Sequence, residues 1–523
     1  MGPVRSLLFA LAALAAVLLP AASAVALSYP VTSTADTEAK GTLRASIKEA
    51  NAHTGADTIP IEVTGTIQLG SPLQVIFDPV SIFGPGAGQL EVRRADAAGA
   101  GFSIFGFSTD AGGSYVSGLT VSNGQAAFGG GIRNAEGSLE LSGVRVKGNE
   151  AVAAGGADDR AEGGGVYSEG PLTVHASLIS GNVARASDGT TETVAAGGGV
   201  AAFHSLTVGT TTVSGNRAEA SGGGGIAVAQ GGGLLTPDET EIDLSTISGN
   251  SVAAEDGGAQ TVAVGGGITV FEAKLTSVTV TGNSATSSGG AFGANLDAFM
   301  TAVVRNTILS RPLGEAGNCN GETVSGGYNL DEDGSCEFEA GSDLVKVAAG
   351  LDPILRDNGG LTPTHALLSG SIAIDRGASF GNGLDQRGAA RPSDFPAISN
   401  KEGGDGSDIG AFELQVPPGG SPAPPVPILV GTESSDRTAP RTRIISGPAR
   451  VGFERRAKFR FTSSEGQSTF QCRVDRKPYR KCRSPYKLKV EPGKHHFRVR
   501  AIDRFGNVDR TAARFSWRVK PVG

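Results

Sequence analysis

Two glutamates have the type and spacing that polysaccharide hydrolysis requires. Glu136 and Glu169 occupy equivalent positions in two successive repeats of the sequence, and each precedes a glycine. If the repeats stack as neighbouring strands, the two carboxylates lie about 5 Å apart, which is the separation that retaining glycosidases use. The glycines also predict turns, where an exposed carboxylate needs no chemical role. Glu136 and Glu169 are therefore catalytic candidates, with exposed turn carboxylates as the favoured interpretation.

Two short acidic segments could supply oxygen ligands to a calcium ion, namely 331–334 and 405–408. Neither contains the complete ligand pattern of an EF-hand loop, so acidic turns are the favoured interpretation. No phosphate-binding loop or dinucleotide fingerprint is recognised in the sequence. His365 is interpreted as a packed residue and not as a base. We therefore expect no cofactor and no metal, with calcium as the weak alternative.

Hydroxyl side chains form a candidate binding face. They flank Val213, Ile247 and Val280 in three successive repeats, and if these aliphatic residues point inward the hydroxyls point outward. A flat hydroxyl surface suits weak contact with a glycan, whereas an ordinary solvated strand is the favoured alternative. The residues of this hydroxyl array are Thr212, Ser214, Thr246, Ser248, Thr279 and Thr281.

A repeat in the middle of the chain must position all of these residues. A Gly-Asn pair recurs every 33 or 34 residues, the differences between positions 149, 182, 216, 250 and 283. A triple glycine marks the same repeat, and residues 230–239 are interpreted as an insertion between the two marks. The asparagines are Asn149, Asn182, Asn216, Asn250 and Asn283. The residues that follow the triple glycines are assigned as Ile132, Val166, Val200, Ile226 and Ile268.

The period of the local pattern identifies these repeats as stacked strands. Residues 277–281 alternate polar and apolar side chains, as a strand does and a helix does not. Repeats of constant length with loops at fixed points indicate a parallel β-helix, right-handed by the preference of parallel crossovers. The asparagines then stack at one corner with their amides hydrogen-bonded along the axis, or serve as turn residues. Either role is structural.

The N-terminal residues predict export. Arg5 precedes an apolar run over 7–19 and the small-residue pattern Ala22-Ser23-Ala24, which is typical of a secretory signal peptide at 1–24. No later stretch is long and apolar enough to span a membrane. We therefore expect an extracellular protein, secreted or attached to the cell surface without a covalent link. A short helix at 42–51, with Thr42 as N-cap, is expected to close the first coils.

Four cysteines form two local pairs in the sequence. Cys319 and Cys336 make one pair, and Cys472 and Cys482 make the other. In an exported protein, two disulfides with short loops are expected. A zinc site is disfavoured because neither pair has metal-ligand spacing.

The net charge of −7 conceals two regions of opposite charge. Residues 437–523 contain 24 Lys and Arg against 6 Asp and Glu, a net charge of +18. The remainder has 45 − 24 = 21 basic and 52 − 6 = 46 acidic residues, a net charge of −25.

Alternating apolar and basic residues after a proline-rich linker at 415–438 predict a basic immunoglobulin-like sandwich at 439–523. Its charge suits an anionic wall polymer or acidic glycan, with a solvated basic surface as the alternative. Specific nucleic-acid binding is not expected, because the basic face lacks base-stacking aromatics.

The chain resembles a family of bacterial exported parallel β-helix proteins. Residues 31–36 with Leu43-Arg44-Ala45 resemble their CSLREA-type N-terminal segment, although Thr42 and its neighbours replace the Cys-Ser of that motif. A second series resembles the choice-of-anchor Q region that ends such helices. Its segments are 352–353, 357–367, 373–377, 385–388 and 408–413. The resemblance covers roughly 30–414 and implies a secreted or surface protein without established catalytic residues.

The C-terminal segment is similar to the immunoglobulin-like repeats of bacterial exported proteins. The similarity rests on 470–472, 482–485 and 500–507, and it implies binding or spacing in place of catalysis. The expected organisation is all-β. It comprises a signal peptide at 1–24, a cap with the first coils at 25–113, β-helix repeats at 114–340, the end of the β-helix at 341–414, a linker at 415–438 and the basic domain at 439–523.

The function expected from these features is adhesion, or glycan or cell-wall binding, by a non-enzymatic extracellular β-helix protein. The continuous repeat without a convergent chemical site favours this hypothesis. The alternative is a polysaccharide lyase or glycoside hydrolase of the β-helix type, with Glu136 and Glu169 as the candidate carboxylates.

Overall fold

The computed structural model describes two compact units. It covers residues 26–109, 112–222, 224–255, 258, 260–416, 439–463, 468–475, 477, 479–502, 508–509 and 511–521. The units are Met1–Val426 and Pro427–Gly523. The predicted signal peptide at 1–24 lies outside the described residues, as does the predicted linker apart from Gln415 and Val416. Within the described ranges, no helix has both the length and the apolar character needed to cross a membrane.

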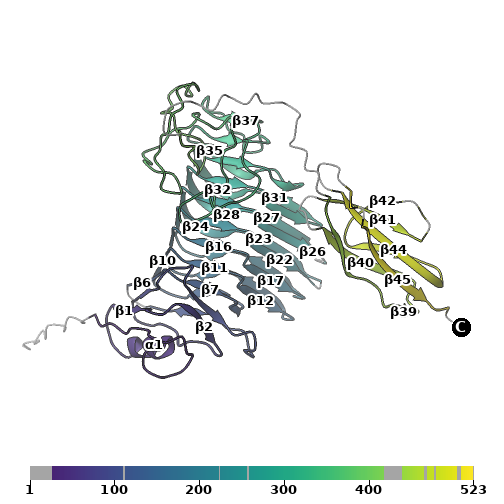
Figure 1. Ribbon diagram of the computed structural model, residues 1–523, viewed down its shortest axis with the longest axis horizontal. Helices are drawn as coiled ribbons and strands as arrows, with labels where there is room; N and C mark the ends of the chain where they lie inside the picture. The colour runs from purple at the N-terminus through teal and green to yellow at the C-terminus, as the bar shows by residue number, and fades with distance from the viewer. Residues whose placement is uncertain are drawn as a thin grey trace, which may run out of the picture. The chain divides into compact units, whose positions relative to one another are not determined.

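The first unit is a parallel β-helix, as predicted (Figure 1). Its largest sheet has 14 strands, all paired in parallel. They are β1 (Asp57–Pro60), β3 (Val80–Phe83), β5 (Phe105–Phe107), β6 (Gly113–Ser117), β9 (Ile132–Asn134), β10 (Ser138–Ser142), β14 (Val166–Ser168), β15 (Leu172–His175), β19 (Val200–Ala202), β20 (Leu206–Gly209), β24 (Leu234–Asp243), β28 (Ile268–Thr276), β32 (Leu296–Arg305) and β35 (Cys319–Ser325).

A second parallel sheet of 11 strands encloses the core opposite the first. Its strands are β2 (Gly65–Leu69), β4 (Leu90–Arg94), β7 (Thr120–Ser122), β11 (Arg145–Lys147), β16 (Leu178–Ser180), β21 (Thr212–Ser214), β25 (Thr246–Ser248), β29 (Thr279–Thr281), β33 (Ile308–Ser310), β36 (Leu330–Asp331) and β37 (Leu344–Val345). Aliphatic side chains from both sheets, such as Val174 and Ile179, are completely buried between them. Their burial is the main stabilising contribution to the stack.

Two smaller parallel sheets pack against each other through alanine side chains. The sheet of seven contains β8 (Gln125–Ala126), β12 (Glu150–Ala154), β17 (Val183–Ser187), β22 (Arg217–Ser221), β26 (Ser251–Glu255), β30 (Ser284–Ser287) and β34 (Leu313–Gly314). The sheet of five contains β13 (Asp158–Glu162), β18 (Glu192–Ala196), β23 (Ile226–Gln230), β27 (Gln260–Val264) and β31 (Gly290–Phe292). Alanines such as Ala184 and Ala195 are fully buried at this contact, so the two sheets approach closely.

A short helix closes the N-terminal end of the β-helix (Figure 1). Helix α1 spans Leu43–Asn51, and the Thr42 hydroxyl accepts a hydrogen bond from the backbone N–H of Ala45 at 3.3 Å. Leu43, Ile47 and Ala50 are buried on one face of the helix. The predicted helix and its N-cap are confirmed.

The asparagine side chains form a continuous column of hydrogen bonds along the stack. In the Asn182 side chain, Nδ2 donates to Asn216 Oδ1 at 2.9 Å and to the Val146 carbonyl at 2.9 Å. Its Oδ1 accepts from the backbone N–H and from Nδ2 of Asn149, both at 3.0 Å. Both donors and the acceptor of a fully buried amide are therefore satisfied. An aspartate could not replace it, because a carboxylate has no donor.

The asparagine column continues beyond the five repeats recognised in the sequence. Asn283 Nδ2 donates to Asn295 at 2.8 Å, Asn295 donates to Asn318 at 2.6 Å, and Asn318 donates to Asp331 Oδ1 at 2.8 Å. Asp331 accepts at both oxygens, since Oδ2 receives the N–H of Cys336 at 2.9 Å. Burial raises the pKa of this aspartate. The column thus ends on a side chain that only needs to accept.

The triple glycines are required by the close approach of the neighbouring coil and of the asparagine column. A Cβ on Gly165 would lie 3.0 Å from Cγ of Asn182 and 2.7 Å from a backbone oxygen of the next coil, and one on Gly164 would lie 2.4 Å from another. The assignment of Ile226 from the sequence as a residue that follows a triple glycine of the repeat is wrong. Leu234 pairs with Val200, so 231–233 is the equivalent triplet, and residues 230–239 are not an insertion. Ile226 instead belongs to β23 in the sheet of five strands.

The end of the first unit folds back along the outside of the 11-stranded sheet. Thr212 donates to the Pro363 carbonyl at 2.6 Å, Thr246 donates to Gln386 Oε1 at 2.6 Å, and Ser248 lies 2.7 Å from His365 Nε2. Because His365 Nδ1 faces the Asp352 carbonyl at 2.7 Å, Nδ1 carries the proton and Nε2 accepts from Ser248. We call residues 351–413 the cover segment.

The predicted hydroxyl array is wrong as a free binding face. Five of its six residues are buried, and only Ser214 is partly exposed. The side chains do point outward, but four of the hydroxyls form hydrogen bonds with the cover segment, and Thr281 pairs with Ser310 at 2.8 Å. The buried members are Thr212, Thr246, Ser248, Thr279 and Thr281.

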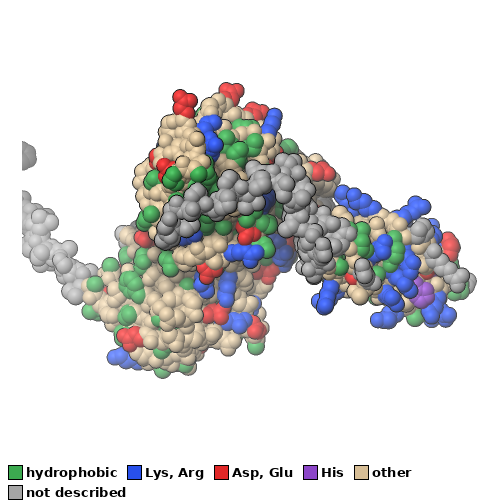
Figure 2. Space-filling view, turned by 45° about the horizontal axis from the view of Figure 1, so that its top comes forward, with side chains coloured by type: hydrophobic (Ala, Val, Ile, Leu, Met, Phe, Trp, Pro, Cys, Tyr) green, Lys and Arg blue, Asp and Glu red, His purple; other side chains and the backbone are tan. Residues whose placement is uncertain are grey.

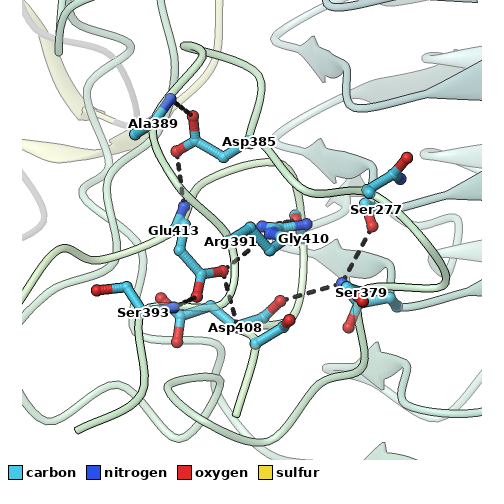
Figure 3. A network of polar contacts seen from close by, with 12 residues as sticks. Ser277, Ser379, Asp385, Ala389, Arg391, Ser393, Asp408, Gly410 and Glu413 are labelled. Carbon is cyan, nitrogen blue, oxygen red and sulfur yellow. Dashed lines mark hydrogen bonds and ion pairs between the residues drawn. The ribbon is translucent and has the colours of Figure 1, made fainter. Parts of the chain in front are cut away.

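A buried ionic network holds the cover segment together (Figure 3). The Arg391 guanidinium donates to Glu413 at 2.8 Å, and both side chains are fully buried. Glu413 also accepts from the backbone of Ser393 and of Asp408 at 2.7 and 3.0 Å. Burial, together with the charge of Glu413, raises the pKa of Asp408 well above its ordinary value. The burial of these carboxyls side by side thus favours the protonated form of Asp408.

Asn216→Ala should destabilise the first unit strongly. The change removes the acceptor of the Asn182 backbone N–H and of one of its side-chain N–H groups, and it removes the side-chain donor to the Ile179 carbonyl, which costs about 3 kcal/mol or more. Urea unfolding followed by far-ultraviolet circular dichroism measures the loss. Ser214→Ala, a partly exposed change two positions away, is the control and should alter stability by less than about 0.5 kcal/mol. Equal midpoints for the two variants would contradict a stabilising column.

Asp375→Asn should remove one source of pH dependence. Burial, followed by the charges of Asp394 and Glu413, raises the pKa of Asp375 to about 7. In the unfolded chain it is about 3.9. Between these values the folded state holds the extra proton, so this contribution to stability is complete below about pH 4 and lost as the pH rises to 7. The variant should therefore gain stability relative to wild type over that interval, measured as thermal midpoints. A constant difference from pH 4 to 8 would contradict the assignment.

Candidate anion-binding site

The second unit consists of two antiparallel sheets resembling a sandwich. One sheet contains β38 (Thr442–Ser446), β40 (Arg456–Ser463) and β43 (Tyr486–Lys489). The other contains β39 (Val451–Gly452), β41 (Thr469–Val474), β42 (Arg480–Cys482), β44 (Gly493–Ile502) and β45 (Ala513–Val519), with β39 alone pairing in parallel. We call this second one the arginine sheet. Phe459, Phe497 and Trp517 pack between the sheets.

Strand alternation gives the arginine sheet one apolar and one basic face. In β44, Phe497 and Val499 are fully buried, whereas Lys494, His496 and Arg498 lie on the opposite face. The register then aligns cations across neighbouring strands. Arg498 is opposite Arg473 on one side and opposite Arg514 on the other. Three arginines therefore form a row across three hydrogen-bonded strands.

The cation row is electrostatically unfavourable on its own. Lys494 is likewise opposite Arg518, and like charges at directly opposed positions destabilise a sheet. Among the described residues, neither these two cations nor the arginines of the row form an ion pair with a carboxylate. Figure 2 shows Lys and Arg side chains gathered on this unit. Such a surface lowers its energy by binding anions.

An open groove of about 850 Å³ includes two arginines of the cation row, Arg473 and Arg498, in its lining. Its lining consists of Arg473, Asp475, Lys477, Lys494, His496 and Arg498. The single carboxylate is engaged at the rim, because Asp475 accepts from His495 Nδ1 at 2.9 Å and from the backbone of His496 at 2.8 Å. Burial raises the pKa of Asp475, but these hydrogen bonds and the histidine charges outweigh it and lower the pKa overall. The groove thus has an excess of positive charge.

An aromatic ring fixes two of the guanidinium groups. Tyr479 lies under Arg473 and Arg500, whose Cζ atoms are 4.9 and 4.2 Å from the ring centroid. Stacking on a ring orients a guanidinium and does not block its in-plane donors. Arg500 uses two of these donors on Gln471 Oε1, at 3.0 and 2.7 Å. Arg473 Nε is buried and has no hydrogen-bond partner among the described residues. Planar guanidinium donors in a row suit bidentate contact with phosphate, sulfate or carboxylate groups.

The other sheet of the second unit is also basic. Arg456 is opposite Lys489, and Lys458 is opposite Lys487. All four side chains are exposed or nearly so, and none belongs to the groove. The charge of the unit is therefore distributed over two faces, but the groove and the ring-fixed arginines belong to the arginine sheet.

The two glutamates proposed from the sequence occupy the same corner of adjacent coils. Asn134 pairs with Ser168, and Leu139 pairs with Leu172, so 135–138 lies beside 169–171. Both carboxylates are exposed, and Glu169 accepts from the Tyr167 hydroxyl at 2.8 Å. Catalysis at this pair stays a prediction.

The acidic segments considered for calcium have structural partners. Asp331 ends the asparagine column, and Asp333 accepts from Ser335 and from the Asn318 backbone. Asp405 accepts from Ser379, and Asp408 belongs to the buried network. In the described ranges, no group of three or more His, Cys, Asp or Glu side chains is placed to hold a metal.

Both predicted disulfides are present. Cys319 joins Cys336 beside the last coils, and Cys472 joins Cys482 across the hairpin of β41 and β42. Disulfides form and persist in oxidising compartments, so both bonds fit an extracellular location.

No protein-family model matches this chain, and no curated protein is significantly similar to it.

Arg498→Thr should stabilise the second unit at low salt. Removing the central charge relieves repulsion on both sides of the row, which corresponds to up to about 1 kcal/mol, and threonine suits a strand. The chain has one tryptophan, Trp517, in the core of this unit, so its fluorescence reports unfolding of this unit alone. The gain should shrink in about 1 M salt, where the Debye length is about 3 Å. Lower stability of Arg498→Thr at low salt would contradict a repulsive row.

Proposed function

We propose that the protein is an exported, non-enzymatic scaffold whose C-terminal unit binds an anionic polymer of the cell wall or an acidic glycan. The observation that carries this proposal is the row of Arg473, Arg498 and Arg514 across three strands, held beside an open basic groove. A row of unneutralised cations lowers stability, and binding of a polyanion would offset that cost.

The geometry favours a polymer over a small anion. Neighbouring strands lie about 4.8 Å apart, so the three guanidinium groups extend over roughly 10 Å. Along β44, alternate residues on one face repeat about every 6.8 Å, which places Lys494, His496, Arg498 and Arg500 in a second line. A chain with regularly spaced charges could contact several of these cations together, and each contact would release counterions.

The first unit would act as a rigid support in this proposal. Its coils are joined by four parallel sheets and by the buried asparagine column. The two disulfides and the apolar segment at 7–19 support export. The family resemblance noted in the sequence supports a surface location.

Two matched triple variants test the binding proposal. Arg473→Ser, Arg498→Ser and Arg514→Ser remove three charges from the arginine sheet, and Arg456→Ser, Lys458→Ser and Arg460→Ser remove three from the other sheet. Polyphosphate and polygalacturonate are the probes, titrated against the full chain over a range of salt concentrations. We expect the first variant to weaken binding about tenfold or more and to reduce the salt slope by more than the control does.

Equal losses in both variants would mean that only net charge matters, and would contradict a groove-based site. Absence of binding to either probe at low salt would contradict the proposal as a whole. A preference between the probes would distinguish phosphate from carboxylate polymers as the ligand class.

The enzymatic alternative has its own readout. Release of reducing or unsaturated sugar ends from a polysaccharide panel, lost in Glu136→Gln or Glu169→Gln, would establish a hydrolase or lyase. The scaffold proposal predicts no such release from the wild-type chain.

A further inference from the structure

One corner of the β-helix exposes large apolar side chains in three of four successive coils. The corner lies between the two halves of the 14-stranded sheet, where 203–205 in one coil is followed by 237–238, 271 and 299–300 in the next three. Phe203, Phe271, Phe299 and Met300 are 36%, 44%, 68% and 49% exposed. We call these four residues the aromatic edge.

Backbone irregularities direct these side chains outward. The register between β24 and β28 shifts between Thr236 and Glu239, and the register between β28 and β32 shifts between Val270 and Glu272. Phe271 lies at both shifts, opposite residues that have no ladder partner. Bulges of this kind re-aim a side chain and are frequent beside binding sites. A polar residue at a solvent-facing bulge would be the less costly choice, so large apolar side chains there indicate contact with another molecule.

The spacing of the aromatic edge suits an extended sugar chain. Consecutive coils are about 4.8 Å apart, so Phe203 and Phe299, separated by three coils, lie roughly 14 Å apart along the axis. One coil is comparable to the length of one sugar unit in an extended polysaccharide. Phe203 is held on one side by the ring of Tyr167, at 5.4 Å between centroids. Apolar side chains in three of the four coils can pack against the apolar faces of sugars along one extended chain.

Polar groups beside the aromatic edge could form hydrogen bonds with a bound glycan. His204 Nδ1 lies 3.9 Å from Asp238, and Lys274 lies 3.5 Å from Glu239, both pairs on neighbouring coils. Glu272 follows Phe271 directly and is exposed. These side chains can exchange hydrogen bonds with sugar hydroxyls. Their carboxylates outnumber the lysine, which disfavours a polyanion and an anionic lipid surface.

We propose that the aromatic edge binds a neutral polysaccharide chain lying parallel to the β-helix axis. This ligand differs in charge from the polymer proposed for the arginine sheet, and its site lies in the other unit. The protein would then connect a neutral glycan with an anionic polymer. The two bindings are separable, because salt weakens contact with a polyanion and leaves aromatic packing nearly unchanged.

The test uses the full chain at high salt and a panel of neutral hexasaccharides built from glucose, mannose, galactose or N-acetylglucosamine. Phe271→Ala with Phe299→Ala removes the centre of the aromatic edge. Phe77→Ala with Phe292→Ala is the matched control, because these residues are 59% and 45% exposed but lie outside the corner. Unchanged thermal midpoints would show that both variants fold.

We expect at least one hexasaccharide to bind and the corresponding monosaccharide to bind far more weakly. The edge variant should lose affinity about tenfold or more, because two aromatic rings no longer bury apolar surface against the sugar. The control variant should keep its affinity. The proposal is overturned if no member of the panel binds, if both variants lose affinity equally, or if chain length has no effect. It is also overturned if the edge variant instead abolishes self-association or the binding of neutral lipid vesicles by the wild-type chain.

Discussion

The hydrogen bond between asparagine amides of neighbouring coils is the interaction on which the first unit depends. Each amide donates to the asparagine ahead and accepts from the one behind, so the register of every coil is coupled to that of its neighbours. In a buried environment such chains reinforce one another. The amides also exclude any Cβ from positions such as Gly165, which connects the glycine content of the chain to the column.

The rigid stack determines what the exterior can present. The outer face of the 11-stranded sheet is covered, because the cover segment forms hydrogen bonds with most of the hydroxyl array. Buried ion pairs hold the cover segment together. The corner of the 14-stranded sheet stays accessible and displays phenylalanine rings in three of four successive coils. The second unit has a different kind of surface. Its arginine sheet places like charges opposite one another and contains an open basic groove. The two units therefore offer surfaces of opposite chemistry.

Features encoded by local periodicity were predictable from the sequence, and features that depend on distant contacts were not. The Gly-Asn spacing gave the β-helix, and Thr42 gave the helix N-cap. Asn295 was missed because it stands where other coils have a glycine, although Gly317-Asn318 repeats the pair and could have been found. The hydroxyl array was misjudged because its partners Pro363 and Gln386 lie 151 and 140 residues away. The arginine row could be found only from the register of the strands, and the aromatic edge only from the positions of the bulges.

Hydrogen exchange at the asparagine column tests the account most directly. The backbone N–H groups of Asn149, Asn182 and Asn216 donate to the side-chain oxygen of the next asparagine, at 3.0 Å in each case. If the column couples the coils, these amides exchange only when the stack opens, and they should be among the slowest in the chain. Protection close to that of exposed strand ends would contradict the claim that the amide column holds the coils in register.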